Sequence, residues 1–194
     1  MDPPDPIRVA LMVGDLFDSL GIPYLVGGSI ASSILGEPRS TDDVDVVAAM
    51  AQAAAAVVDR LQREFFVQED AVREAVERHE SFNAIHRELM LKVDVFVMSE
   101  DDFHREAMKR RRSVLVTTDP PRSLFVSSAE DTVLQKLLWY RLGGEVSEKQ
   151  WRDVKGVLKV QRGRLDGAYL DRWARTLGLE DLFSRVLEES GGPR

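Results

Sequence analysis

The sequence predicts an α+β fold, in which a mixed β-sheet with flanking helices is followed by a C-terminal helical bundle. Up to residue 127, short apolar runs of strand length alternate with amphipathic helical stretches, and from residue 128 onward only helical periodicity is found. The composition is 44% hydrophobic and 30% charged, the balance of an ordinary globular protein. The 194 residues therefore suit an α/β core over 1–127 and a helical subdomain over 128–194.

The first part of the core alternates helices with strands. Apolar residues at helical spacing predict a helix over 7–20, and the apolar run at 24–26 predicts a covered strand. A short helix over 30–35 ends at a glycine. The next apolar strand carries Asp43 and Asp45.

The rest of the core continues this alternation. We expect two strands within SFNAIHRELMLKVDVFV, joined near residues 87–88. Helices are expected over 50–64, 71–78 and 100–109, and extended pieces over 114–117 and 124–126.

Helices fill the C-terminal part. The stretch 130–142 has an apolar stripe that leaves Lys136 and Tyr140 on another face, where Lys136 is exposed in the simplest interpretation. Ser147 and Gln150 form a capping box for the next helix, whose Trp151 we assign to the core rather than to a base-stacking surface. Arg152 and Asp153 lie on the remaining face, where they either line the cleft or, in the simpler interpretation, form an ordinary pair on the helix surface.

Two aspartates occupy alternate positions of one strand. Because side chains alternate between faces, Asp43 and Asp45 project from one side while Val44 and Val46 project from the other. Two carboxylates on one face repel each other unless a cation lies between them. Mg²⁺ suits such oxygen ligands, since it takes one or two carboxylates plus water and phosphates.

A glycine pair precedes the short helix. Gly27 and Gly28 allow close approach of a ligand to the backbone, and Ser29 adds a hydroxyl at a helix N-terminus that favours anions. The alternative is a tight strand-to-helix turn without a ligand. Arg39 either pairs with a phosphate or a carboxylate through its planar guanidinium group or is a surface residue, and Thr41 is either a phosphate-side residue or a turn former.

Asp94 lies in a later apolar strand, where an unpaired carboxylate would be costly. It is a metal ligand, a base that deprotonates an attacking hydroxyl, or an edge aspartate that reaches solvent.

Together, Gly-Gly-Ser, R-x-T-x-D-V-D and this lone aspartate resemble the nucleotidyltransferase superfamily typified by polymerase beta. More narrowly, the chain is similar to small bacterial AbiEii-type toxins, with EDTVLQKLLWY resembling their lysine-bearing helix. The resemblance implies transfer of a nucleoside monophosphate from a nucleoside triphosphate to a hydroxyl of RNA, protein or a small molecule. It implies that Mg²⁺ is bound by Asp43, Asp45 and Asp94 and that phosphates are contacted by Gly27, Gly28, Ser29, Arg39, Thr41 and Lys136.

Charge and composition limit the partners. The formal net charge of −7 argues against a protein that coats nucleic acid, because such binding depends on lysine and arginine. Without cysteines there is no disulfide or thiolate site, and no secretory signal or long apolar run is present. We expect a cytoplasmic location and no membrane contact.

Two further classes of function stay open. A non-catalytic binding protein of the same fold, such as an antitoxin or regulatory partner, is the main alternative, and a small partner protein fits either role. A metal-dependent phosphohydrolase is disfavoured because the three histidines lack metal-ligand spacing.

Overall fold

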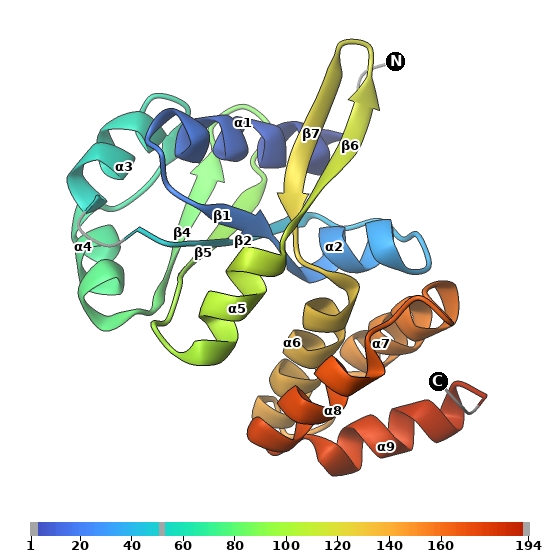
Figure 1. Ribbon diagram of the computed structural model, residues 1–194. Coiled ribbons are helices and arrows are strands. Elements are labelled where there is room, and N and C mark those ends of the chain that lie inside the picture. The colour runs from blue at the N-terminus through green and yellow to red at the C-terminus, as the bar shows by residue number, and fades with distance from the viewer. Residues whose placement is uncertain (1–3, 51–52, 192–194) are drawn as a thin grey trace. The chain divides into compact units, whose positions relative to one another are not determined.

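The structure is a computed structural model that describes residues 4–50 and 53–191 (Figure 1). These residues form helices and one mixed sheet, which confirms the α+β class. The chain divides into two compact units, described separately below. The sheet unit comprises Met1–Ile30 and Thr41–Ser127, and the helical unit comprises Ala31–Ser40 and Ser128–Arg194.

The sheet unit contains a seven-stranded sheet in the order β3-β4-β5-β2-β1-β7-β6. Strand β2 pairs in parallel with β5 and antiparallel with β1, while β1 pairs in parallel with β7. The remaining pairs, β3 with β4, β4 with β5 and β6 with β7, are antiparallel. The strands are β1 Tyr24–Val26, β2 Asp43–Ala48, β3 Phe65–Phe66, β4 Ser81–His86, β5 Lys92–Val97, β6 Arg112–Thr118 and β7 Pro121–Val126.

Helices of the sheet unit pack on this sheet. Helix α1 contacts β1, β2 and β7, and α4 contacts β4 and β5 (Figure 1). The helices of this unit begin and end within a few residues of the positions that apolar spacing predicts. The exception is α3, which is shorter than the helix predicted over 50–64. The helices are α1 Asp5–Ser19, α3 Ala54–Leu61, α4 Glu69–Arg78 and α5 Asp102–Arg110, and α2 Gly28–Leu35 crosses the boundary between the units along the chain.

The alternation of side chains predicted for β2 and β5 is present. Val44 and Val46 of β2 and Val93 and Val95 of β5 are fully buried, whereas the residues between them are partly exposed or exposed. One face of these two central strands therefore builds the core. The other face carries the acidic side chains.

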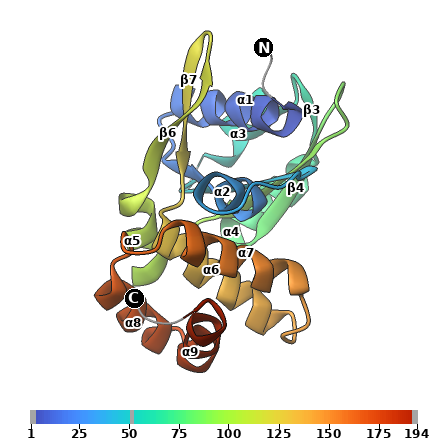
Figure 2. The ribbon, with the colours of Figure 1, turned by 90° about the vertical axis from the view of Figure 1, so that its right-hand side faces the viewer.

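In the helical unit, α6 packs against α7 and α8, and α9 packs against the same two helices (Figure 2). Three of them begin at a side-chain cap, in which Ser128, Ser147 or Asp166 accepts a backbone N–H. The helices are α6 Ala129–Leu142, α7 Glu148–Val160, α8 Gly167–Thr176 and α9 Glu180–Glu189.

Two details of α7 differ from the sequence predictions. Ser147 caps the helix as predicted, but the Gln150 side chain accepts a hydrogen bond from Lys136 at 3.1 Å. Trp151 is only half-buried, lines a surface groove of about 890 Å³ and donates its indole N–H to Glu189 at 2.8 Å. The core stripe of α7 consists of Val154, Val157 and Leu158 instead.

No helix within residues 4–50 and 53–191 has both the length and the apolar character needed to cross a lipid bilayer.

Candidate active site

Three aspartates, Asp43, Asp45 and Asp94, share one face of the sheet, and we call them the acidic cluster. Strands β2 and β5 run in parallel in a register that places Asp45 directly beside Asp94 and Asp43 beside Lys92. Asp43 and Asp45 are two residues apart in β2, so they point to the same face. The Asp43 side chain is 48% exposed and that of Asp94 is 18% exposed. The fold thus brings together carboxylates that are far apart in the sequence.

Lys92 provides a cation within this cluster. Its Nζ lies 2.7 Å from Oδ2 of Asp94 and 3.9 Å from Oδ1 of Asp43. The hydrogen bond to Asp94 raises the pKa of the Lys92 ammonium above its usual range, against a smaller opposing effect of burial, and the negative charges of Asp94, Asp43 and Asp45 add to the increase. Lys92 therefore stays protonated beside the acidic cluster.

Gly28 allows the backbone to approach Asp45. It has a φ of +52°, and a Cβ atom added there would lie 1.8 Å from Oδ2 of Asp45. Both the left-handed conformation and the absence of a side chain are required at this position. The sequence predicted a helix start at residue 30, but α2 begins at Gly28, so the first residue of the helix lies against the Asp45 side chain.

The other residues predicted around this turn stay close to the strand ends. The Gly27 N–H donates to the carbonyl of Asp45 at 2.9 Å, and Ser29 is buried. The Thr41 hydroxyl contacts the backbone of Asp43, with its Oγ1 at 3.2 Å from the carbonyl oxygen and 3.4 Å from the nitrogen. Thr41 thereby fixes the start of β2.

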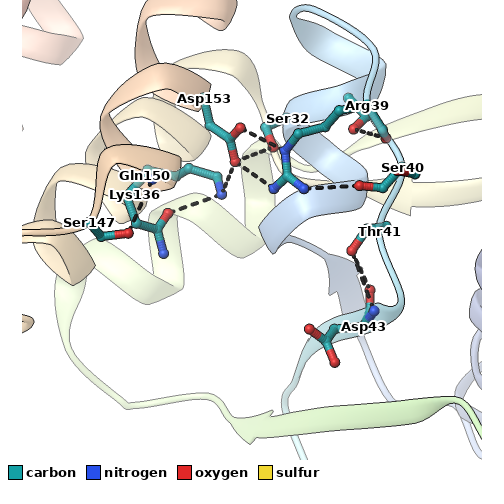
Figure 3. A network of polar contacts seen from close by, with 10 residues as sticks. Ser32, Arg39, Ser40, Thr41, Asp43, Lys136, Ser147, Gln150 and Asp153 are labelled. Carbon is teal, nitrogen blue, oxygen red and sulfur yellow. Dashed lines mark hydrogen bonds and ion pairs between the residues drawn. The ribbon is translucent and has the colours of Figure 1, made fainter.

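In the helical unit, Arg39, Lys136 and Asp153 form a second group of charges, which we call the helical ion cluster (Figure 3). Arg39 donates from Nε to Oδ1 and from Nη2 to Oδ2 of Asp153, both at 2.8 Å. The Lys136 Nζ lies 2.7 Å from Oδ2, and the Ser32 hydroxyl donates to the same oxygen at 3.2 Å. One carboxylate thus binds two cations through a bidentate pair and a second ion pair.

The helical ion cluster is buried. The side chains of Asp153, Lys136 and Arg39 are 4%, 6% and 18% exposed. Burial raises the pKa of the Asp153 carboxyl, but hydrogen bonds and charge from Arg39 and Lys136 outweigh it and lower the pKa to about 2. Lys136, predicted to be exposed in its simplest interpretation, is an internal residue here.

A family model described as aminoglycoside-2''-adenylyltransferase matches residues 9–135, more than half of the chain. The chain belongs to this family. The match includes the whole acidic cluster and the Gly28 turn, and it ends one residue before Lys136. The prediction of a nucleotidyltransferase enzyme is thereby confirmed.

Several solved structures have a fold similar to that of this chain. A nucleotidyltransferase-like protein from Paracoccidioides brasiliensis aligns at a TM-score of 0.58 and 14% identity, over 97% of this chain and 93% of that one. The antibiotic-resistance factor ANT(2'')-Ia, in complex with adenylyl-2''-tobramycin, aligns at 0.56 and 12%, over 89% and 96%. The lincosamide antibiotic adenylyltransferase LnuA, bound to lincomycin, aligns at 0.53 and 14%, over 82% and 99%. At these identities the likeness concerns the fold.

No curated protein sequence matches the chain. The findings support the superfamily, whereas the narrower resemblance to AbiEii-type toxins stays a prediction.

The family uses chemistry that a divalent cation commonly assists, and the acidic cluster offers the carboxylate oxygens that such an ion prefers. Among the described residues, no three His, Cys, Asp or Glu side chains are arranged so as to hold a metal ion. The Lys92 ammonium lies against two of the three carboxylates as a stand-in cation. The chemistry of the donor set suits a divalent ion, while in this arrangement the carboxylates hold the Lys92 ammonium.

Sequence reasoning missed the environments of two residues in this family member. The sequence favours a surface pair for Asp153, although its spacing from Gln150 and Val157 puts it on one stripe of α7, and it is buried there. A carboxylate at a core position is the signal that predicts a buried cationic partner. Lys92 shares a strand face with Asp94, but its contact with Asp43 depends on the register between strands.

Proposed function

We propose that the chain transfers a nucleoside monophosphate from a nucleoside triphosphate to a hydroxyl group of a small molecule, with a divalent cation held by Asp43, Asp45 and Asp94. The observation that carries this proposal is the register of β2 and β5, which aligns Asp45 with Asp94 in a member of the adenylyltransferase family. Gly28 supports it, because its lack of a side chain leaves room for the Asp45 carboxylate beside the start of α2.

In the proposed reaction the acceptor oxygen bonds to the α-phosphorus, the bond to the pyrophosphate breaks, and the hydroxyl proton passes to a carboxylate. Asp94 is the candidate for this proton, since it lies beside Asp45 and its side chain is mostly buried. A bound Mg²⁺ would supply charge neutralisation of the triphosphate and of the leaving pyrophosphate. The protein side chains hold and orient the reactants.

The phosphate contacts are part of the proposal. Gly28 and Ser29 provide the first N–H groups of α2, where anions are favoured, and Gly27 shapes the turn before them through its hydrogen bond to the Asp45 carbonyl. We assign Arg39 and Lys136 to the triphosphate as well, each of them held in a defined position by Asp153. Thr41 supports Asp43 through the backbone contact at the start of β2.

A small-molecule acceptor is favoured over a macromolecule. The family description names an aminoglycoside, and two solved structures of the same fold contain antibiotic ligands. The net charge of −7 weighs against RNA as the acceptor, because nucleic-acid binding depends on basic residues.

The test is transfer of label from each of the four nucleoside triphosphates, with Mg²⁺, to a panel of hydroxyl-bearing antibiotics and to total RNA and protein from a cell extract. Label in a small molecule is the expected result. Asp45→Asn should reduce the transfer by about 10²- to 10³-fold or more, the loss typical when one preorganised charge-stabilising group is removed. Asp59→Asn is the matched control, because Asp59 is an exposed α3 residue paired with Arg63.

Other outcomes contradict specific parts. Label in RNA or protein would refute the small-molecule acceptor and would instead fit the toxin role that the AbiEii resemblance implies. Full activity of Asp45→Asn, with a normal circular dichroism spectrum, would refute the assignment of the acidic cluster.

A further inference from the structure

Lys92 is the basic residue at the acidic cluster, and its position is set by the sheet. It stands opposite Asp43 across the β2–β5 pairing and two residues before Asp94 on the same strand. Because side chains repeat every two residues along a strand, Lys92 and Asp94 project from the same face. Its ammonium accordingly lies 2.7 Å from one carboxylate and 3.9 Å from the other.

We propose that Lys92 is a built-in competitor of the divalent cation, whose ammonium binds Asp94 and Asp43 in the metal-free protein and leaves them when the metal binds. The inference rests on the proposed function, because it requires that the acidic cluster be the metal site. The observation behind it is that the Lys92 ammonium contacts two of the three carboxylates that the strand register brings together.

The exchange is energetically feasible. The Lys92 side chain is 45% exposed, and partly exposed ion pairs contribute little net free energy, so the ammonium can move into solvent at small cost. The flexible four-carbon stem of lysine allows this movement without a change in the backbone. A divalent cation interacts with the same carboxylates with twice the charge.

The competitor also has a function in the metal-free state. Three ionised carboxylates on one sheet face repel one another, and the ammonium reduces that repulsion. Lys92 therefore reduces the repulsion between carboxylates in the metal-free sheet and at the same time lowers the affinity for metal. Removal of the positive charge should strengthen metal binding, which is the opposite of what loss of a merely structural residue would do.

The experiment is titration of Mn²⁺ into nucleotide-free protein, followed by electron paramagnetic resonance of the free ion, so that no turnover is required. Lys92→Gln should bind Mn²⁺ about tenfold more tightly than the wild type, from the loss of one unit charge within a few ångströms of a divalent ion at a solvent-exposed site. Lys92→Met provides a second neutral variant that keeps the apolar stem. Lys92→Arg keeps the charge and should bind Mn²⁺ as the wild type does.

Two controls separate this inference from the proposed function. Lys109→Gln removes the same charge from an exposed position of α5 and should leave Mn²⁺ affinity unchanged. Asp45→Asn should weaken Mn²⁺ binding in both the wild-type and the Lys92→Gln backgrounds.

If Asp45→Asn weakens binding but neither neutral Lys92 variant strengthens it, Lys92 is no competitor and the metal site stands. If Asp45→Asn has no effect on Mn²⁺ binding, both the metal assignment and the role of Lys92 are wrong.

Discussion

The two charged groups of this enzyme use the same kinds of side chain in opposite environments. In the acidic cluster, Lys92 and Asp43 are 45% and 48% exposed, and carboxylates outnumber cations. In the helical ion cluster, Lys136 and Asp153 are 6% and 4% exposed, and the two cations outnumber the single carboxylate. The first arrangement suits the exchange of one cation for another, and the second suits cations that are held in fixed positions.

The difference follows from the cost of removing charges from water. A buried ion needs partners for nearly all its hydrogen-bonding groups, and Asp153 receives hydrogen bonds from Arg39, Lys136 and Ser32. A half-exposed ion such as Lys92 keeps water as an alternative partner. Substitutions in the two clusters should therefore have different effects on stability and on ligand binding.

The largest expected difference in the free energy of unfolding is between Asp153→Asn and Asp94→Asn. Asp153→Asn removes the carboxylate that pairs with the buried Lys136 and the mostly buried Arg39, and it should lower the free energy of unfolding by about 3–5 kcal/mol. Asp94→Asn should change it by no more than about 1 kcal/mol, because its partner Lys92 is half-exposed. Urea denaturation followed by circular dichroism measures both. Equal losses of unfolding free energy would mean that the exposure of the two clusters does not determine how much each contributes to stability.

A smaller effect is expected from glycine substitutions in the sheet unit. Gly21 and Gly28 both have a positive φ, but only at Gly28 does an added Cβ meet another atom, the Asp45 carboxylate. Gly21→Ala should cost about 1–2 kcal/mol from backbone strain. Gly28→Ala should lower the free energy of unfolding by about 1–3 kcal/mol more than Gly21→Ala does, because of overpacking. It should also weaken Mn²⁺ binding, because Asp45 must move.

Gly21→Ala is the matched control for that measurement, since it carries the same strain with open space around it. Unchanged Mn²⁺ affinity in Gly28→Ala would show that the position of Asp45 relative to α2 does not matter for the metal.

The alternation of side chains along strands made the acidic cluster predictable. Asp43, Asp45 and the valines between and after them fixed which face would be acidic, and the strand at 24–26 was located at its observed bounds. That Asp94 lies beside Asp45 was an expectation from the resemblance to nucleotidyltransferases. Single-strand periodicity gives the face of a side chain, whereas the neighbour across the sheet depends on the register.

The helical ion cluster was not predictable to the same extent. Helical periodicity indicates which face is buried, but the partners of Asp153 come from residue 39 and from another helix. Trp151 shows the converse error, because a large aromatic residue at helical spacing was assigned to the core and lies in a surface groove. In both cases the tertiary contacts, which periodicity does not contain, decided the environment.

The pH dependence of stability tests the ionisation of Asp153 in the helical ion cluster. The pKa of Asp153 is about 2 in the folded protein, below the ordinary value of 3.8. A group with a lowered pKa stabilises the fold above its unfolded pKa and loses this contribution as the pH falls through the folded pKa. The wild type should therefore lose stability relative to Asp153→Asn between about pH 4 and pH 2. A constant difference in the free energy of unfolding between the two proteins over this pH range would contradict the lowered pKa of Asp153.

The smallest effect is expected for Lys92→Met in the absence of metal. Loss of the ammonium restores repulsion within the acidic cluster, but the half-exposed pair contributes no more than about 1 kcal/mol to the free energy of unfolding. The loss should shrink further as salt is raised from 0.05 M to 0.5 M, because exposed charges are screened over distances of about 10 Å or less. Chemical denaturation in urea at the two salt concentrations measures this. A large, salt-independent loss would identify Lys92 as a structural residue and would remove the physical basis for its exchange with a metal ion.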